Sequence, residues 1–292
     1  MLSGNHWDCS LNLDWALKLN PAVVKDLEEL KCFKQPYPGK PVVAIARFKH
    51  NVYINCPPEC ECSLPDVVRD PSNFKLVPII EVNCSDRGLT ELPPIIPTQT
   101  KILTLERNSI ENLDPLIFNA LYRGIQDLYL DSNYIDSIEE LEGSYWLSHF
   151  RVLSLRNNKL THLPTYALDN ALQRNPNMPV AVRIFLGNNP WRCDCVFTPG
   201  FQEMLQKYET QIRDIDDIKC SYVEGDENSL TLISELSRSS VCRLPNEYSI
   251  RILDLLNGIL ATLIVLILGK LAYDYYYFKK TGKLPWIVTK MP

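Results

Sequence analysis

The sequence lacks the short motifs that mark the common enzyme classes. Its 292 residues contain no G-x-S-x-G, H-E-x-x-H, G-x-x-x-x-G-K-[ST] or G-x-G-x-x-G segment. The four histidines (His6, His50, His149 and His162) are scattered, so we expect loop or surface positions rather than a metal site. We therefore predict a protein that is not an enzyme and that uses no cofactor and no metal.

Basic charge and glycine are also scarce. A formal net charge of −5 argues against a nucleic-acid-binding protein, because such proteins usually carry a basic face. Only 11 glycines exclude a collagen-like chain, and an apolar content of 46% excludes a disordered one. Cysteine, in contrast, is abundant. Ten cysteines are an even number that suits disulfides in an oxidising compartment.

Cysteine and charge are distributed unevenly along the chain. Every cysteine lies between Cys9 and Cys242, and the last fifty residues have none. Residues 1–250 carry a net charge of −9, whereas residues 270–292 carry +4. The average composition thus combines two parts that we expect to occupy different surroundings.

An apolar run near the C-terminus separates these two parts. Leu255–Gly269 is uncharged, and Lys270 can snorkel from the end of a slightly longer span. The tyrosines from Tyr273 to Tyr277 resemble an interfacial belt, and the lysines after them resemble a cytosolic flank. A buried core helix is the alternative. We predict a type I plasma-membrane protein with an extracellular N-terminus, a linker over 243–252, a transmembrane helix over 253–273 and a cytosolic tail over 274–292.

The first twenty residues do not resemble a signal peptide. They have no basic start and no continuous apolar stretch, because Asp8, Asp14 and Lys18 interrupt them. Since the predicted orientation requires export, we expect the natural product to begin upstream with a signal peptide.

Residues 100–190 contain a repeat. Three segments beginning at Thr100, Ile125 and Phe150 align without gaps, and a fourth beginning at Ala181 fits more loosely. Each matches L-x-x-L-x-L-x-x-N-x-L, the leucine-rich-repeat pattern. We predict four repeats in a curved parallel sheet, with a convex side that is mostly irregular or short-helical. We also expect inward asparagines that bond to backbone groups at each turn, namely Asn108, Asn133, Asn158 and Asn189.

Strand residues that alternate with the inward leucines should form the concave face. This face offers aromatic side chains, acids towards its N-terminal end and arginines towards its C-terminal end. Aromatic and Arg side chains often anchor protein interfaces, although a merely solvated face is the alternative. The predicted partner-binding residues are Thr104, Glu106, Asp127, Tyr129, Asp131, Arg156, Arg183 and Phe185. A second candidate is a loop over 169–179, where the last repeat is longer than the others.

Cysteine clusters flank the repeats, Cys56-x₃-Cys60-x-Cys62 before them and Asn189-Pro-Trp-x-Cys-x-Cys195 after them. A Cys₄ zinc site is one interpretation. The clusters also resemble the N-terminal cap (56–99) and C-terminal cap (191–242) of extracellular leucine-rich-repeat proteins. That resemblance implies the pairs Cys193–Cys220, Cys195–Cys242, Cys56–Cys62 and Cys60–Cys84.

Residues 1–55 are an extension that we assign to no known module. Asn20-Pro21 resembles a helix start, and the apolar spacing predicts a helix to about Cys32. Residues 36–55 read as a turn and two short strands. A Cys9–Cys32 disulfide follows by elimination.

The tail TGKLPWIVTKMP, placed after a single span and a short capped array, is similar to the insect halfway and singed-wings group of leucine-rich-repeat membrane proteins. The predicted function is recognition of an extracellular or membrane protein partner, as an adhesion molecule, co-receptor or receptor-complex subunit. The alternative is a structural or matrix-organising protein without a signalling role. The sequence indicates neither the partner nor the oligomeric state.

Overall fold

The computed structural model describes residues 1–242 and 252–282. The chain divides into two compact units, Met1–Cys242 and Arg243–Pro292. The predicted linker up to residue 251 and the predicted tail beyond Gly282 lie outside the described residues.

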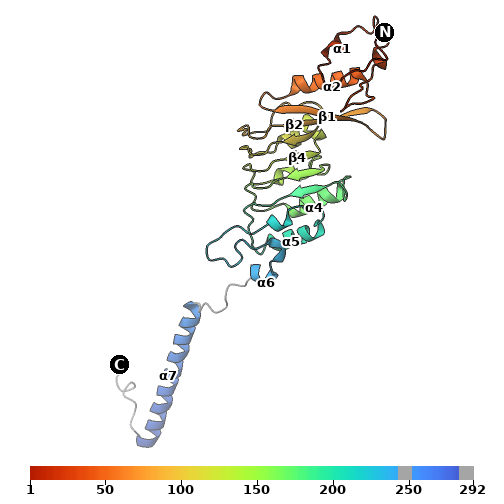
Figure 1. The fold of residues 1–292 in the computed structure, drawn as a ribbon. Helices are drawn as coiled ribbons and strands as arrows, with labels where there is room; N and C mark the ends of the chain where they lie inside the picture. Colours follow the sequence, from red (N-terminus) through yellow and green to blue (C-terminus); the bar gives the residue numbers. More distant parts are fainter. Residues whose placement is uncertain (243–251, 283–292) are drawn as a thin grey trace. The chain divides into compact units, whose positions relative to one another are not determined.

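One sheet runs through the first unit, with its six strands in sequence order (Figure 1). The first two strands are antiparallel and form a hairpin, whereas each later strand is parallel to the one before it. This arrangement confirms the predicted leucine-rich-repeat solenoid. The strands are β1 (Glu61–Arg69), β2 (Leu76–Asn83), β3 (Thr100–Thr104), β4 (Asp127–Tyr129), β5 (Val152–Ser154) and β6 (Arg183–Phe185).

The core lies between the sheet and the convex side. Alternate strand residues point inward, so Leu103, Leu128 and Leu153 are no more than 1% exposed. Burial of each such leucine stabilises the fold by roughly 1.5–3 kcal/mol. Trp146 and Phe150 fill the same core from the convex side, with ring centroids 5.5 Å apart.

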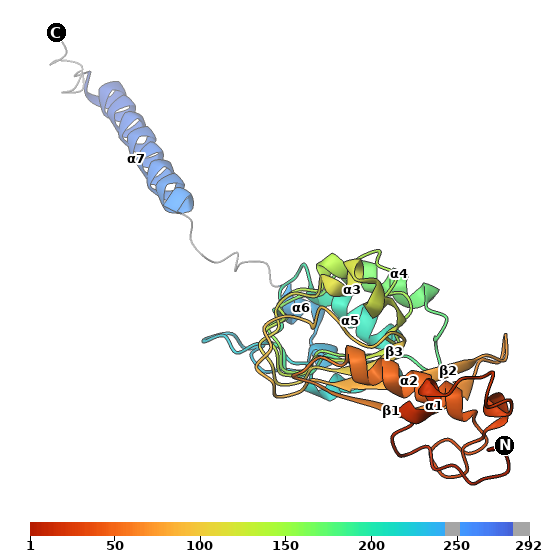
Figure 2. The ribbon, with the colours of Figure 1, turned by 90° about the horizontal axis from the view of Figure 1, so that it is seen from above.

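The convex side carries short helices, as predicted, and Figure 2 shows α3 and α4 on one face of the solenoid. The predicted loop over 169–179 is largely helical instead, because α4 extends to Arg174 and buries Leu168 and Leu172. The convex elements are α3 (Pro115–Phe118), η2 (Ala120–Gly124), η3 (Glu139–Leu141) and α4 (Thr165–Arg174).

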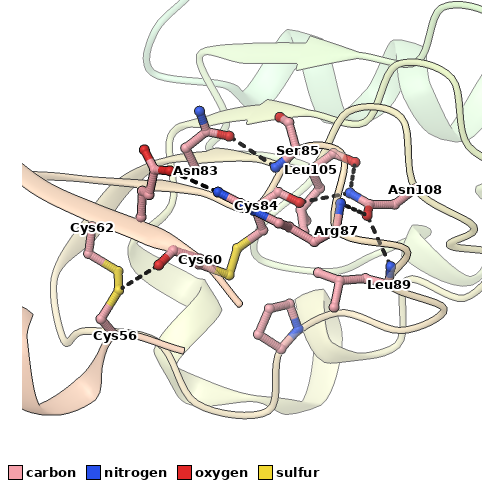
Figure 3. The surroundings of a disulfide bond; sticks show 12 residues. Cys56, Cys60, Cys62, Asn83, Cys84, Ser85, Arg87, Leu89, Leu105 and Asn108 are labelled. Carbon is pink, nitrogen blue, oxygen red and sulfur yellow. Dashed lines mark hydrogen bonds and ion pairs between the residues drawn. A yellow bond between two sulfur atoms is a disulfide. The ribbon is translucent and has the colours of Figure 1, made fainter. Parts of the chain in front are cut away.

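The repeat asparagines join successive repeats. Asn133 Nδ2 donates to the carbonyl oxygens of Leu105 (2.9 Å) and Leu130 (3.0 Å), and Asn133 Oδ1 accepts from Ile110 N (3.0 Å). Figure 3 shows the same pattern at Asn108, which connects the first complete repeat to the N-terminal cap. Asn158 and Asn189 repeat it further along. All four side chains are buried, so they satisfy backbone groups that water cannot reach.

The prediction of a helix between Asn20 and Cys32 is wrong. Asn20 Oδ1 does accept a hydrogen bond from Ala22 N (2.9 Å), but it caps only a single turn. The segment then forms the short 3-10 helix η1 (Leu27–Glu29). Val23 is 77% exposed and therefore provides none of the tertiary packing that stabilises most helices of this length.

The two strands predicted within residues 36–55 are also wrong. This segment contains one helix, α2 (Val42–Asn55), which follows Pro41 and packs against α1 (Asp14–Lys18) and β1. Valine and isoleucine favour strands by propensity. Here Val42, Ile45 and Ala46 share a buried face at helical spacing, so packing overrides propensity.

Every cysteine is paired, which rules out the Cys₄ zinc site. Two disulfides hold each cap, and one closes the N-terminal extension. The pairs are those named above: Cys9–Cys32, Cys56–Cys62, Cys60–Cys84, Cys193–Cys220 and Cys195–Cys242.

The C-terminal cap closes the last repeat around an aromatic cluster. Trp191 is fully buried, and its ring centroid lies 4.9 Å from that of Phe201 and 6.3 Å from that of Phe197. These rings cover the apolar end that a solenoid would otherwise expose. The cap contains α5 (Thr198–Lys207), η4 (Ile215–Asp217), η5 (Ile233–Glu235) and α6 (Arg238–Val241).

The second unit contains one long helix, α7 (Ile252–Thr281). By length and composition, Asp254–Thr281 is apolar enough to cross a membrane, and none of its apolar window is buried in the protein. This exposure disfavours the alternative of a soluble core helix. The helix continues beyond the predicted end at Tyr273, and Lys270 Nζ lies 2.8 Å from Asp274 Oδ1.

The carboxylate of Asp26 attaches the start of the chain to the N-terminal extension. Its Oδ2 accepts hydrogen bonds from the backbone N–H groups of Ser3 (2.6 Å) and Leu2. These bonds, the one from Ser3 foremost, lower the pKa of Asp26 from 3.8 to about 2. Because this pKa is depressed, the attachment is complete above about pH 4 and is lost as the pH falls through about 2.

We therefore expect acidification to release residues 2 and 3 with a midpoint near pH 2. NMR titration of the Leu2 and Ser3 amide resonances measures this release. In Asp26→Asn the titration should disappear. A midpoint at the ordinary carboxyl value of 3.8 in the wild type would contradict the assigned contacts.

Candidate interaction surface

The concave face is built from strand residues in exact register. Thr104, Tyr129, Ser154 and Phe185 pair in turn across four neighbouring strands and form a central column. Asn83 of β2 continues this column towards the N-terminal cap. Because paired residues share a face, these side chains point to the same side of the sheet.

A flanking column includes the predicted residues Asp127 and Arg183, which are aligned through Val152. Asp127 is only 5% exposed. Arg151 covers it and donates through both Nε (2.7 Å) and Nη2. Its carboxylate is therefore satisfied within the protein and offers little to a partner.

The third column contains Glu106, Asp131 and Arg156, and most of its charge is paired internally. Asp131 Oδ1 accepts hydrogen bonds from Ser154 Oγ and from Arg156 N (3.1 Å). Glu106 Oε2 lies 3.2 Å from Arg107 Nη1. Glu106 remains available to a partner, since its ion pair with the exposed Arg107 is easily exchanged.

The C-terminal cap covers the last part of the concave face. Asp214, whose side chain is 2% exposed, accepts from Arg156 Nε (2.9 Å), Leu186 N (3.0 Å) and Gly187 N (2.8 Å). A Cβ on Gly187 would lie 2.6 Å from the Asp217 Cβ, so glycine is required at this close approach. The positive charge predicted towards the C-terminal end of the concave face is consequently neutralised at Arg156.

Arg156 also covers Phe185. Its guanidinium carbon lies 4.4 Å from the Phe185 ring centroid, which gives a cation–π contact. Phe185 therefore belongs partly to an internal stack. Of the two predicted aromatic anchors, Tyr129 is the one without such a cover.

Tyr129 occupies the middle of the remaining open surface. It is half-buried on β4, between Thr104 and Ser154. Burial, together with the nearby Asp127, raises the pKa of its phenol, so the hydroxyl stays protonated at neutral pH. A neutral phenol on an apolar ring suits an interface that alternates apolar and hydrogen-bonding contacts.

Two residues of this surface were missed by the sequence interpretation. Arg151 directly precedes β5, and the next residue, Val152, pairs with Asp127. A basic residue beside the position that pairs with an acid was a weak signal for this ion pair. Asp214 lies 58 residues after Arg156, and nothing in the repeat pattern indicates that it returns to the sheet. Among the described residues, no group of three or more His, Cys, Asp or Glu side chains is arranged to hold a metal ion.

Comparison with known proteins identifies relatives of this chain. Residues 253–290 match the model of the Halfway C-terminal domain. Protein singed wings 2 of Drosophila melanogaster is 39% identical over 100% of this chain and 59% of its own length. Protein halfway of the same organism is 34% identical over 82% of this chain and 38% of its own length. The chain thus spans less than two thirds of either relative.

Among solved structures, the glycosylated Toll–Spätzle complex of Drosophila aligns with 81% of this chain and 30% of that chain. The TM-score is 0.49 and the sequence identity is 21%.

Proposed function

Since the chain is a homologue of the singed wings 2 and halfway proteins, with a capped leucine-rich-repeat unit and one apolar helix, we propose that it is a type I surface protein that recognises a protein partner. Five disulfides and a charge of −9 over residues 1–250 support an extracellular position for the first unit. The lysines that follow α7 support a cytosolic tail.

The orientation can be tested on intact cells. A membrane-impermeant biotin reagent should label lysines of the first unit, such as Lys34 and Lys219. Lys279 and Lys280 should be labelled only after the membrane is permeabilised. The reverse pattern would contradict type I topology at the plasma membrane.

We place partner recognition on the N-terminal two thirds of the concave face. Tyr129 carries this proposal, because it is the uncovered aromatic residue of the central column and lies beside Thr104, with the charge of Glu106 nearby. The C-terminal third is occupied by Asp214 and the cap, so Arg156 and Phe185 make a smaller contribution than their residue types suggest.

Substitution of Tyr129 tests the proposed surface. Tyr129→Ala should weaken partner binding by about 2 kcal/mol, roughly 30-fold, because aromatic anchors dominate such interfaces. Proximity labelling with the full chain on cells identifies the partner, and titration of that partner measures the change.

Tyr134→Ala is the matched control, since Tyr134 is 49% exposed and follows Asn133 outside the strand columns. Unchanged binding for Tyr129→Ala would contradict a concave site. If binding is lost but deletion of residues 274–292 leaves the cellular role intact, the protein has the structural, matrix-organising role instead of a signalling one.

A further inference from the structure

A groove lies on the N-terminal cap, between the loop over 57–59 and the segment over 89–95 that follows β2. It has a volume of about 440 Å³. One wall is formed by Pro57 and Pro58, and the other by the segment from Leu89 to Ile95. This site is separate from the strand columns of the concave face.

Both walls of the groove are fixed. The loop that carries Pro57 and Pro58 lies between cysteines of the two cap disulfides (Figure 3). The opposite wall is held by the next repeat, where Tyr122 Oη donates to Pro93 O (2.7 Å) and Asn119 Nδ2 donates to Pro94 O (3.0 Å). The groove is therefore preformed, which lowers the entropic cost of filling it.

The groove combines an apolar interior with an acidic rim. Prolines have no N–H group and an apolar ring as side chain, and the carbonyl oxygens of Pro93 and Pro94 are already bonded to the next repeat. The neighbouring Ile95 is 59% exposed. Glu59 and Glu91 line the same groove, are exposed, and form no ion pair with any described residue. Such a site suits an aromatic side chain that is flanked by basic residues.

The connection between β1 and β2 presents a side chain of this kind. Phe74 is 73% exposed at the tip of the hairpin, and Arg69 and Lys75 are exposed beside it. Figures 1 and 2 both show this connection projecting beyond the later strands. The tip is ordered, because Phe74 N donates to Asp70 O (2.8 Å) and the Asp70 carboxylate accepts from Ser72 N (2.8 Å).

We infer that two copies of this chain pair through these features, with Phe74 of each copy in the proline-walled groove of the other. Arg69 and Lys75 would then face Glu59 and Glu91, so the charges are complementary. The hairpin tip precedes β2, whereas the groove wall follows the end of β2. Tip and groove therefore lie towards opposite ends of the same strand. A twofold axis can bring each tip to the other groove, which gives a closed dimer.

The first test uses two differently tagged full-length chains that are co-expressed and solubilised in mild detergent. Wild-type chains should recover each other, and Phe74→Asp in both should reduce recovery about tenfold or more, since a buried aromatic anchor is replaced by a charge. Tyr222→Asp, at another exposed aromatic residue, is the control and should leave recovery unchanged.

The second test exchanges the charges. An acid-swapped chain (Glu59→Lys with Glu91→Lys) and a base-swapped chain (Arg69→Glu with Lys75→Glu) should each fail to pair with themselves. When the two variants are mixed, both reciprocal contacts again join opposite charges, so pairing should return. This rescue also shows that neither variant failed merely because it misfolded. Glu224→Lys with Glu235→Lys, in the C-terminal cap, is the control pair.

Three results would overturn the proposal. They are wild-type chains that stay monomeric, pairing that survives Phe74→Asp and both charge swaps, and swapped variants that do not rescue each other. Pairing through α7 alone would give the second result. Because Tyr129 lies outside the contact, failure here leaves the concave-face proposal intact.

Discussion

Asn133→Ala should lower the free energy of unfolding by about 2–6 kcal/mol. The substitution leaves the buried N–H of Ile110 without a partner, which costs about 1–3 kcal/mol. It also removes one hydrogen bond each from the carbonyl oxygens of Leu105 and Leu130, at about 0.5–1.5 kcal/mol apiece. These two carbonyls keep their bonds from Asn108 and Asn158. Water cannot replace the lost bonds, because Asn133 is only 3% exposed.

The measurement is denaturant unfolding of the full chain in detergent with its disulfides intact. Tryptophan fluorescence reports the transition, since Trp146 and Trp191 are buried in the first unit. Asn170→Ala is the matched control, because Asn170 lies on α4 away from the asparagine ladder and should change stability by no more than about 0.5 kcal/mol. Equal effects of the two substitutions would show that the ladder contributes no specific stability.

Asp214→Ala is expected to cost about 3 kcal/mol and to alter the concave face as well. Removal of this buried carboxylate leaves Leu186 N and Gly187 N unsatisfied and releases the guanidinium of Arg156. Breaking a buried pair from one side costs about 3–5 kcal/mol. The partial exposure of Arg156 allows water to replace one contact, so the lower end of that range applies.

Asp216→Ala, at an exposed neighbour in the same cap segment, controls for local changes of helix propensity. The first readout is the free energy of unfolding, measured by denaturant unfolding as for Asn133→Ala. The second is the affinity for the partner, because a released Arg156 adds positive charge beside Phe185. An Asp214→Ala protein as stable as Asp216→Ala would refute the role assigned to this carboxylate.

The repeat pattern predicted the sheet because the positions of its leucines and asparagines depend only on nearby residues and recur at a regular spacing. The inward positions of Leu103, Leu128 and Leu153 follow from the two-residue period of a strand, and the spacing of the asparagines places them at equivalent turns. The columns of the concave face then follow without reference to any long-range contact. Thr104, Tyr129 and Phe185 therefore appear in register, as the alternation requires.

The N-terminal extension could not be predicted in the same way. This extension contains no sequence repeat. Its secondary structure could therefore be predicted only from residue propensities and helix-capping signals. The Asn20 cap was real but closed only one turn, since the exposed Val23 does not join Leu27 and Leu30 in one buried helical face. Val42, Ile45 and Ala46 formed a helix against strand propensity, because α1 and β1 supplied a surface for them to pack on.

The sequence by itself determined a leucine-rich solenoid between cysteine-rich caps and one apolar helix near the C-terminus. These features depend on local period, spacing and composition. Only the tertiary structure decided which part of the concave face is open. Asp214 and Arg151 reach Arg156 and Asp127 across 58 and 24 residues, and they neutralise charges that the strand pattern left free. The ion pair between Asp214 and Arg156 forms because the C-terminal cap folds back onto the sheet. No local sequence pattern indicates where this contact occurs.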